Sequence, residues 1–438
     1  MDLLAASLPP GTVGLPGPES WIVQPVGGAA RVPLNTGASV GGGTPDAGRL
    51  RPGSACAIPL ITGDARLGAI GTVTWVDGDD VLMMGHPFMQ RGPVAWPLAT
   101  AEILTVFPSR QMSFKMGSIG DVVGTVHHDR RAGLAGRVGA APGMVPVAVA
   151  VRSGDQELTY GFEVVDDSRL TATMVFWALY NSLLAQGDDA SEQSLGYRIE
   201  TLWEGGGDLG EEPLVLEGVT AGPGGAMRLA SEWMAPLNIL LNNPFSEVRL
   251  REVRARLEVS RPMAAATISG VTGARVLSAG SDQAVYQVEV TPRQGKPETL
   301  EISLALPASL EPGPYRLLVA SAAELFAFES QRATGRFQVS SLEAIVDILR
   351  TERSASTLVV ALLAPGGNLV LPGRELHDLP GSVSRLISAG NMQASRTLAD
   401  YVARSHRPVP WALGGFAVRA VTVEAAVEPF KEERRPGS

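Results

Sequence analysis

The feature that most constrains the fold is a series of short apolar runs, separated by turn residues, that begins at Arg51. Residues 67–76 and 81–84 form one such pair of runs, and Asp77-Gly78-Asp79-Asp80 separates them. Asp-Gly between two apolar runs is a strong hairpin signal, because glycine accepts the positive φ that a tight turn needs. The chain has 50 glycines and 32 prolines among 438 residues, so turn signals are frequent. We therefore expect a mainly β protein rather than a helical bundle.

Two segments carry helical signals instead. Residues 171–186 are apolar over most faces and predict a half-buried helix. Ser340-Ser341-Leu342-Glu343 has a hydroxyl three residues before a glutamate, which is the spacing of a capping box. An amphipathic helix is predicted to follow it.

The chain is long enough for more than one domain, because a single domain usually has about 100–200 residues. Residues 1–50 are rich in Gly, Pro, Thr and Ala without periodicity, which is typical of a linker or a frayed N-terminal segment. Regular alternation from residue 245 to residue 340 predicts an immunoglobulin-like β-sandwich. A β-rich domain is predicted over 51–190, and its part up to residue 165 is expected to form an incomplete barrel-like sheet. The remaining predicted segments are a connecting β region over 191–244, a small mixed α/β segment over 341–430 and a charged tail over 431–438.

Composition excludes several classes of function. A net charge of −9 argues against nucleic acid as a partner, because phosphate binding needs a basic surface. Cys56 is the single cysteine, so a disulfide framework and a multi-cysteine metal site are excluded. No apolar run approaches the ~18 residues of a transmembrane helix. A signal peptide has a basic region followed by a sustained apolar region, and the first residues of this chain have neither. The localisation is therefore unknown from the sequence.

His86 is the first candidate for chemistry among the five histidines. It lies in Met84-Gly85-His86-Pro87, where glycine permits a close backbone approach and proline turns the chain. A strand end beside a turn is a common place for a general base. The alternative is a histidine whose hydrogen bonds are satisfied within the turn.

The other candidate residues have weaker signals. His127 and Asp129 share one face of a predicted strand and could share an ion, but His128 points to the opposite face and no third ligand is evident. A polar strand end before an arginine turn is the simpler interpretation. His377 and His406 are expected in solvated loops, and Cys56 is expected to be a small buried apolar residue. No cofactor or metal is expected.

A serine nucleophile usually lies in a tight, glycine-flanked loop that supplies backbone N–H groups for an oxyanion. The chain has no Gly-x-Ser-x-Gly motif. The nearest approximations are Ser54, Ser118 and Ser269, and each is predicted to be a turn residue.

Several motifs between residues 51 and 165 occur in an order that resembles the SpoIVB-type serine endopeptidase family. These motifs are Gly71-Thr72-Val73-Thr74, Asp77-Gly78-Asp79, Gly85-His86-Pro87-Phe88, Pro97-Leu98, Ala101-Glu102-Ile103-Leu104-Thr105-Val106, Ser113-Phe114-Lys115, Gly124-Thr125-Val126, Asp129-Arg130 and Gly133-Leu134-Ala135-Gly136. The later part of the chain is similar to the region C-terminal to this domain in the large, non-sporulation relatives.

The resemblance implies a chymotrypsin-like, mainly β fold and a His/Asp/Ser triad, with His86 at the position of the family's histidine. The family's Gly-Met-Ser-Gly-Ser-Pro motif is absent from this chain, and neither Asp121 nor Asp129 lies in a motif that supports the role of the triad aspartate. We therefore expect an incomplete peptidase domain, namely the C-terminal portion of a longer enzyme that carries the general base but not the nucleophile. Such a chain alone is expected to be inactive, because a triad acts as a unit.

The resemblance also implies a protein or peptide substrate, other envelope proteins as further candidate partners, and an extracytoplasmic location if an upstream signal exists. The alternative function is a noncatalytic, peptidase-like binding or scaffold protein of the cell envelope.

Overall fold

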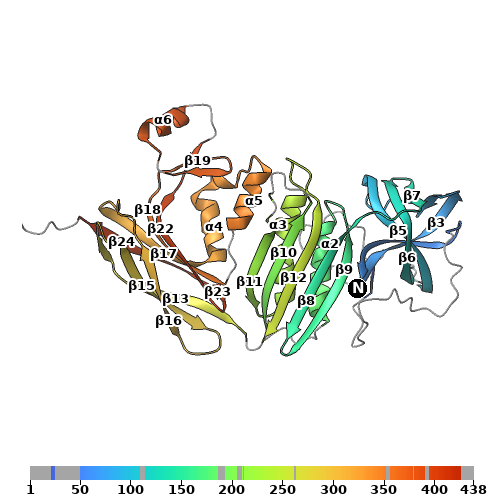
Figure 1. Cartoon of the computed structure of the whole chain (residues 1–438), viewed down its shortest axis with the longest axis horizontal. Helices are drawn as coiled ribbons and strands as arrows, with labels where there is room; N and C mark the ends of the chain where they lie inside the picture. The colour runs from blue at the N-terminus through green and yellow to red at the C-terminus, as the bar shows by residue number, and fades with distance from the viewer. Residues whose placement is uncertain are drawn as a thin grey trace, which may run out of the picture. The chain divides into compact units, whose positions relative to one another are not determined.

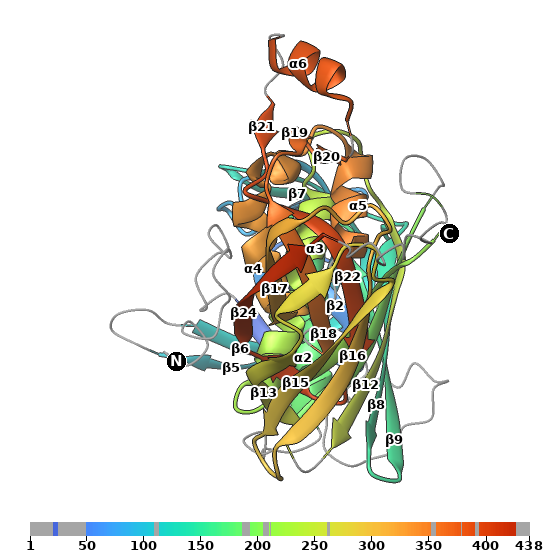
Figure 2. The same cartoon turned by 90° about the vertical axis from the view of Figure 1, so that its left-hand side faces the viewer.

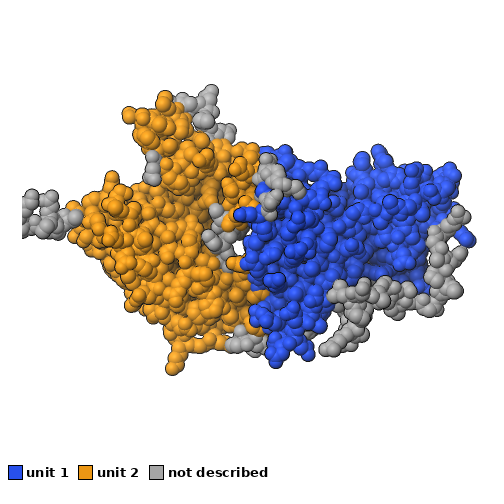
Figure 3. Space-filling view, viewed as in Figure 1, with its two compact units in different colours: residues 1–190, 197–216, 224–259 blue, residues 191–196, 217–223, 260–438 orange. Residues whose placement is uncertain are grey.

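The structure is a computed structural model. It describes residues 21–24, 50–108, 114–185, 193–204, 210, 212–260, 263–351, 356–377, 379–389 and 394–425. Strands make up 56% of it and helices 18%, so the prediction of a mainly β protein is confirmed. The chain divides into two compact units, shown in two colours in Figure 3: residues 1–190, 197–216 and 224–259 form the first, and residues 191–196, 217–223 and 260–438 the second.

Six antiparallel strands of the first unit form a closed ring. In ring order they are β2 (Ala55–Gly63), β3 (Arg66–Asp77), β4 (Asp80–Met83), β7 (Gly133–Val138), β6 (Phe114–Arg130) and β5 (Gly92–Phe107). β2 pairs with both β3 and β5, so the ring closes where an incomplete barrel-like sheet was expected. The predicted hairpin at Asp77–Asp80 is confirmed, since these two residues pair across a turn in which Gly78 has a φ of +60°. Strand β1 (Trp21–Gln24), within the segment expected to be a linker, pairs with β3.

A long ribbon extends the ring. β5 pairs with β2 only at Ala99 and Thr100, and β6 pairs with β7 only from Gly124 onward. The stretch Ala101–Phe107 of β5 and the stretch Phe114–Ile119 of β6 pair with each other alone, and Figure 2 shows them as a two-stranded projection. Its side chains include Leu104, which is 68% exposed.

The same sheet continues from β2, which pairs with β9 at Ile61–Gly63. Beyond β2 its order is β9 (Gln156–Val165), β8 (Met144–Ser153), β12 (Leu250–Ser260), β10 (Ser194–Trp203) and β11 (Leu214–Ala221). Helices α2 (Thr171–Leu184) and α3 (Gly225–Leu241) pack against each other beside this sheet (Figure 1). The predicted helix over 171–186 is confirmed up to Leu184.

Two predictions about this region need correction. The connecting β region over 191–244 contains a helix, α3, whose buried Leu229, Trp233, Leu237 and Leu240 recur at helical spacing. Residues 250–260 do not open the sandwich, because β12 pairs in parallel with β8. The expected boundary at residue 245 therefore moves to about residue 260.

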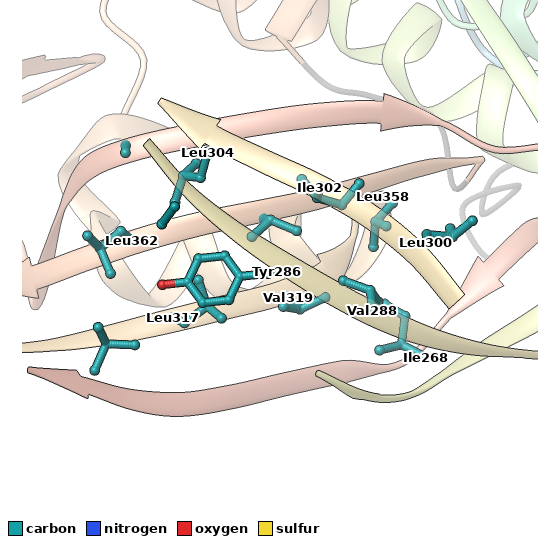
Figure 4. Close-up of a cluster of buried hydrophobic side chains, with 14 of the residues drawn as sticks. Ile268, Tyr286, Val288, Leu300, Ile302, Leu304, Leu317, Val319, Leu358 and Leu362 are labelled. Atoms are coloured by element: carbon teal, nitrogen blue, oxygen red, sulfur yellow. The ribbon is translucent and has the colours of Figure 1, made fainter. Parts of the chain in front are cut away.

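Two sheets of the second unit pack around one apolar core. The first is β16 (Glu298–Ala305), β15 (Gln283–Pro292), β13 (Ala265–Gly273) and β23 (Ala412–Gly414); the second is β14 (Val276–Ser278), β24 (Phe416–Glu424), β17 (Gly313–Ser321), β18 (Thr357–Pro365) and β22 (Ala399–Pro408). Tyr286 and Val288 from one sheet meet Leu317, Val319 and Leu358 from the other in this core (Figure 4). Strands β18, β22, β23 and β24 of the segment predicted over 341–430 therefore belong to these two sheets.

Helices and a small sheet cover the second unit. They are α4 (Ala322–Arg332), the 3-10 helix η3 (Thr334–Phe337), α5 (Leu342–Thr351), α6 (Gly381–Ala389) and the strands β20 (Arg374–Leu376), β19 (Leu369–Leu371) and β21 (Ser395–Arg396). The helix predicted after Ser340 is confirmed as α5. Its cap lies one residue later than predicted, since Ser341 Oγ accepts the backbone N–H of Ala344 at 3.1 Å.

The predicted charged tail over 431–438 lies outside the described residues, as does most of the segment 1–50. Within the described ranges, we find no helix with the length and apolar character needed to cross a membrane.

Candidate functional site

His86 lies on the loop between β4 and β5, and its imidazole is exposed. Two consecutive residues before it, Met84 and Gly85, have left-handed φ values of 69° and 68°. Methionine rarely adopts this conformation. Here the Met84 side chain packs directly on Gly71, and a side chain at position 71 would clash with it, since an added Cβ would lie 2.6 Å from Met84 Cγ. The Gly71-Thr72 segment of β3 therefore accommodates the turn that carries His86.

Within the described part of the chain, the imidazole of His86 makes one hydrogen bond. Its Nδ1 lies 2.8 Å from the carbonyl oxygen of Pro87. A carbonyl oxygen can only accept, so Nδ1 must carry the proton. In the neutral ring the lone pair is then on Nε2, and this is the nitrogen that can take up a proton.

Asp129 holds the loop that follows His86. Its carboxylate is fully buried at the end of β6 and accepts backbone N–H groups from Phe88 at 2.9 Å, Met89 at 2.6 Å and Arg91 at 3.2 Å. The register of β6 against β7 shifts between Val126 and His128, just before this residue. The loop is therefore fixed by charge-assisted hydrogen bonds from a strand of the barrel.

A second carboxylate anchors the end of the same loop. Asp167 accepts Arg91 Nη2 and Trp96 Nε1, each at 3.1 Å. The rings of Phe88 and Trp96 meet edge to face with centroids 5.7 Å apart. The loop between β4 and β5 is thus tied both to the barrel and to the segment that begins α2.

Among the residues that the structure describes, the parts of a catalytic triad do not come together around His86. Pro87 supplies the one hydrogen-bond partner of His86 among the described residues. Asp129 directs both carboxylate oxygens to the loop backbone rather than to the imidazole. Asp121 is exposed on β6, and no hydrogen bond joins its carboxylate to His86.

The three serines considered from the sequence have other roles. Ser54 Oγ accepts the backbone N–H of Arg51 at 2.9 Å in the turn before β2, as predicted. Ser118 and Ser269 were expected in turns but lie within β6 and β13, because their glycine neighbours are part of strands. Ser269 Oγ donates to the Glu289 carbonyl at 3.1 Å.

The His127–Asp129 segment lies at the end of strand β6. The rings of His127 and His128 pack edge to face with centroids 5.1 Å apart. The Asp129 carboxylate already holds three backbone N–H groups. In the part of the chain that the structure describes, no three His, Cys, Asp or Glu side chains lie close enough to hold a metal ion.

The remaining candidates differ in their surroundings. Cys56 is buried, and burial raises the pKa of its thiol to about 12. His377 Nδ1 lies 3.2 Å from Asn368 Nδ2 and is exposed after β20. His406 is a strand residue of β22 rather than the loop residue that was expected, because β22 pairs with β18 through it.

Sequence reasoning missed a buried ionic cluster in the second unit. Arg332 is 2% exposed and donates to both Glu329 oxygens, at 2.9 and 3.0 Å. It also donates to the Glu375 carboxylate and to the Ala399 carbonyl. Tyr401 donates to Glu329, and the Arg332 guanidinium lies 4.7 Å from the centroid of its ring. The i,i+3 spacing of Glu329 and Arg332 is the one local signal of this cluster.

No family model, curated protein or solved structure matches the chain.

Proposed function

We propose that this chain is the histidine-bearing part of a SpoIVB-like serine endopeptidase, with His86 as the general base. The proposal rests on the hydrogen bond from Nδ1 of His86 to the Pro87 carbonyl. Because Nδ1 makes this bond, the lone pair of Nε2 is left for a proton from another group. A general base of acyl transfer needs a neutral imidazole in a fixed tautomer. This bond supplies that tautomer.

The rigidity of the loop supports the same role. A catalytic base is effective only when its position is fixed before the substrate arrives. Asp129 fixes the backbone at Phe88, Met89 and Arg91, within five residues of the imidazole. His86 is thus both exposed and attached to a restrained loop.

The architecture is compatible with the expected fold. A closed antiparallel β-barrel is the kind of scaffold on which chymotrypsin-like peptidases carry their triad. Two packed sheets in the second unit agree with an immunoglobulin-like sandwich. A chymotrypsin-like barrel in the first unit and an immunoglobulin-like sandwich in the second unit are therefore part of the proposal.

In the proposed reaction, Nε2 of His86 takes the proton of a serine hydroxyl as its oxygen attacks a peptide carbonyl, and then returns it to the leaving amine. The sequence has no serine motif of the family, so that hydroxyl would come from outside these 438 residues. The substrate would be a protein or peptide of the extracytoplasmic space.

One observation favours the alternative of a noncatalytic envelope scaffold. His86 has no carboxylate partner among the described residues, and a triad histidine needs one to stabilise the imidazolium that forms. On this alternative the loop is a remnant of a peptidase fold.

Labelling with a fluorophosphonate probe separates the two functions. The chain alone should not be labelled, whereas the product of the gene extended upstream should be labelled at one serine, and His86→Ala should abolish that labelling. His127→Ala is the matched control, since this histidine lies on the same barrel. An extended product that carries a serine motif yet is not labelled would favour the scaffold.

A further inference from the structure

A cavity of about 350 Å³ lies in the first unit, where β2 of the barrel pairs with β9. Strands β2, β3, β5, β6, β8 and β9 contribute to its wall, together with the segment between β7 and β8. Its charged lining residues are Arg66, Asp121 and Glu163. We propose that this cavity binds a small zwitterion, namely a free α-amino acid with an apolar side chain.

Arg66 supplies the cationic side of the cavity. It is half-buried on β3, and its Nη1 donates to the carbonyl oxygen of Ile119 at 2.5 Å. Among the residues that the structure describes, its side chain makes no other hydrogen bond and no ion pair. A guanidinium has five N–H donors in a planar fork that matches the two oxygens of a carboxylate. One contact with a backbone carbonyl therefore orients Arg66 and leaves donors for a ligand carboxylate.

Asp121 on β6 and Glu163 on β9 supply the anionic side of the same cavity. Both residues are exposed, and in the described ranges neither carboxylate has a hydrogen-bond or ion-pair partner. An ammonium group carries three N–H donors, so two carboxylates can share it. Opposite charges that are not paired with each other in one concavity favour a ligand that carries both signs.

A β-bulge places Asp121 in the cavity wall. The register of β5 against β6 shifts here, so that Thr100 alone opposes both Gly120 and Asp121. Thr100 Oγ1 accepts the backbone N–H of Asp121 at 3.2 Å, and a Cβ at position 120 would lie 2.3 Å from this oxygen. Bulges next to functional sites commonly redirect a side chain. Glycine at position 120 thus allows the bulge that brings Asp121 to the lining.

The apolar part of the lining selects the rest of the ligand. Pro97, Pro142 and Met144 contribute to the wall, as does Val122, which is 36% exposed. A concave site with apolar walls and a few charged groups is typical of small-molecule binding. The apolar wall fits an aliphatic side chain next to the two charges of an amino acid.

The volume limits the size of that ligand. Small-molecule sites usually measure roughly 300–1,000 Å³, so a cavity of about 350 Å³ fits one amino acid rather than a larger cofactor. The site is independent of the proposed peptidase role, because none of its lining residues belongs to the loop that carries His86.

Isothermal titration calorimetry of the full chain tests the proposal with three probes: leucine, leucinamide and N-acetyl-leucine. At about pH 6.5, below the usual α-amino pKa of about 8, leucinamide keeps only the ammonium and N-acetyl-leucine only the carboxylate. We expect leucine to bind at least about tenfold more tightly than either, because each analogue loses one charge-assisted contact and about 1.4 kcal/mol is a factor of ten. An analogue that binds as tightly as leucine, or no binding of leucine at about 10 mM, would overturn the proposal.

Matched variants locate the binding. Glu163→Gln should weaken leucine at least about fivefold, whereas Glu157→Gln should not, because Glu157 lies on the same strand but outside the lining. Both glutamates are exposed, so neither change is expected to unfold the chain. Equal effects of these two changes would overturn the proposal.

Arg66→Gln tests the other charge. It should remove the preference for leucine over leucinamide, and urea unfolding shows whether this variant is folded. A folded Arg66→Gln variant that keeps the full preference would overturn the proposal. If the variant does not fold, the comparison of Glu163→Gln with Glu157→Gln decides.

Discussion

The carboxylate of Asp129 accepts the backbone N–H of Phe88 at 2.9 Å, although 41 residues separate the two along the chain. The same carboxylate accepts the N–H groups of Met89 and Arg91. Three donors from one loop thus converge on one buried charge, and the loop that carries His86 depends on it.

Replacing Asp129 with alanine should therefore destabilise the first unit. The change leaves three backbone N–H groups without their acceptor, and a lost hydrogen bond to a buried charge costs about 1.5–3 kcal/mol. We expect the free energy of unfolding in urea to fall by about 2–4 kcal/mol. Asp121→Ala, at an exposed position of the same strand, should change it by less than about 0.5 kcal/mol. Equal effects of the two changes would show that the Asp129 contacts do not stabilise the loop.

His86→Ala should cost little stability. The imidazole is exposed, and its one hydrogen bond is to the adjacent residue's carbonyl, which water can replace. The expected change in the urea unfolding free energy is within about 0.5 kcal/mol. A loss well above 1 kcal/mol would mean that the histidine is architectural, and the proposed base would lose its best support.

Local signals in the sequence were sufficient to predict elements formed by residues that are close in sequence. The Asp77–Asp80 hairpin followed from one glycine in the turn, and α2 followed from a continuous apolar segment. α3 had a detectable signal in Leu229, Trp233, Leu237 and Leu240, but Pro236 lies inside the helix and glycines precede it. Proline and glycine usually mark helix ends, so they obscure this helical signal in the local sequence.

Long-range pairings were not predictable in the same way. The parallel pairing of β12 with β8 joins residues about a hundred positions apart, and the alternation of β12 fits any half-exposed sheet. The position of Asp129 follows a register shift in β6 between Val126 and His128. Nothing in the local sequence distinguishes Asp129 from a solvated residue at a strand end.

The thiol of Cys56 should be unreactive in the folded chain. Burial raises its pKa to about 12 from an ordinary value of 9.0, so almost no thiolate is present at pH 8. A disulfide reagent should react at that pH only after urea unfolds the chain. Because the folded state holds this proton more tightly, the thiol leaves stability unchanged below pH 9 and lowers it between pH 9 and 12. Rapid reaction under native conditions would contradict the burial.

Glu375 should contribute to stability as an ionised partner of Arg332. Burial raises the pKa of this carboxyl, but the hydrogen bonds and charge of Arg332 outweigh that effect and the net pKa is lowered. Its contribution is therefore fully present above about pH 4.5 and is lost as the pH falls through the lowered pKa. Glu375→Gln should cost about 2–4 kcal/mol at pH 7 in urea unfolding, because it leaves a buried guanidinium undercompensated. Glu298→Gln, on the exposed face of β16, should be neutral, and an equal loss there would refute this account.

The rate of peptide hydrolysis by the upstream-extended gene product, with and without His86, tests the central claim most directly. If His86 is the general base, His86→Ala should lower kcat by about 10⁴-fold or more, while His127→Ala should leave it within a few fold. Hydrolysis that persists at the unaltered rate in the His86→Ala variant would contradict the assignment.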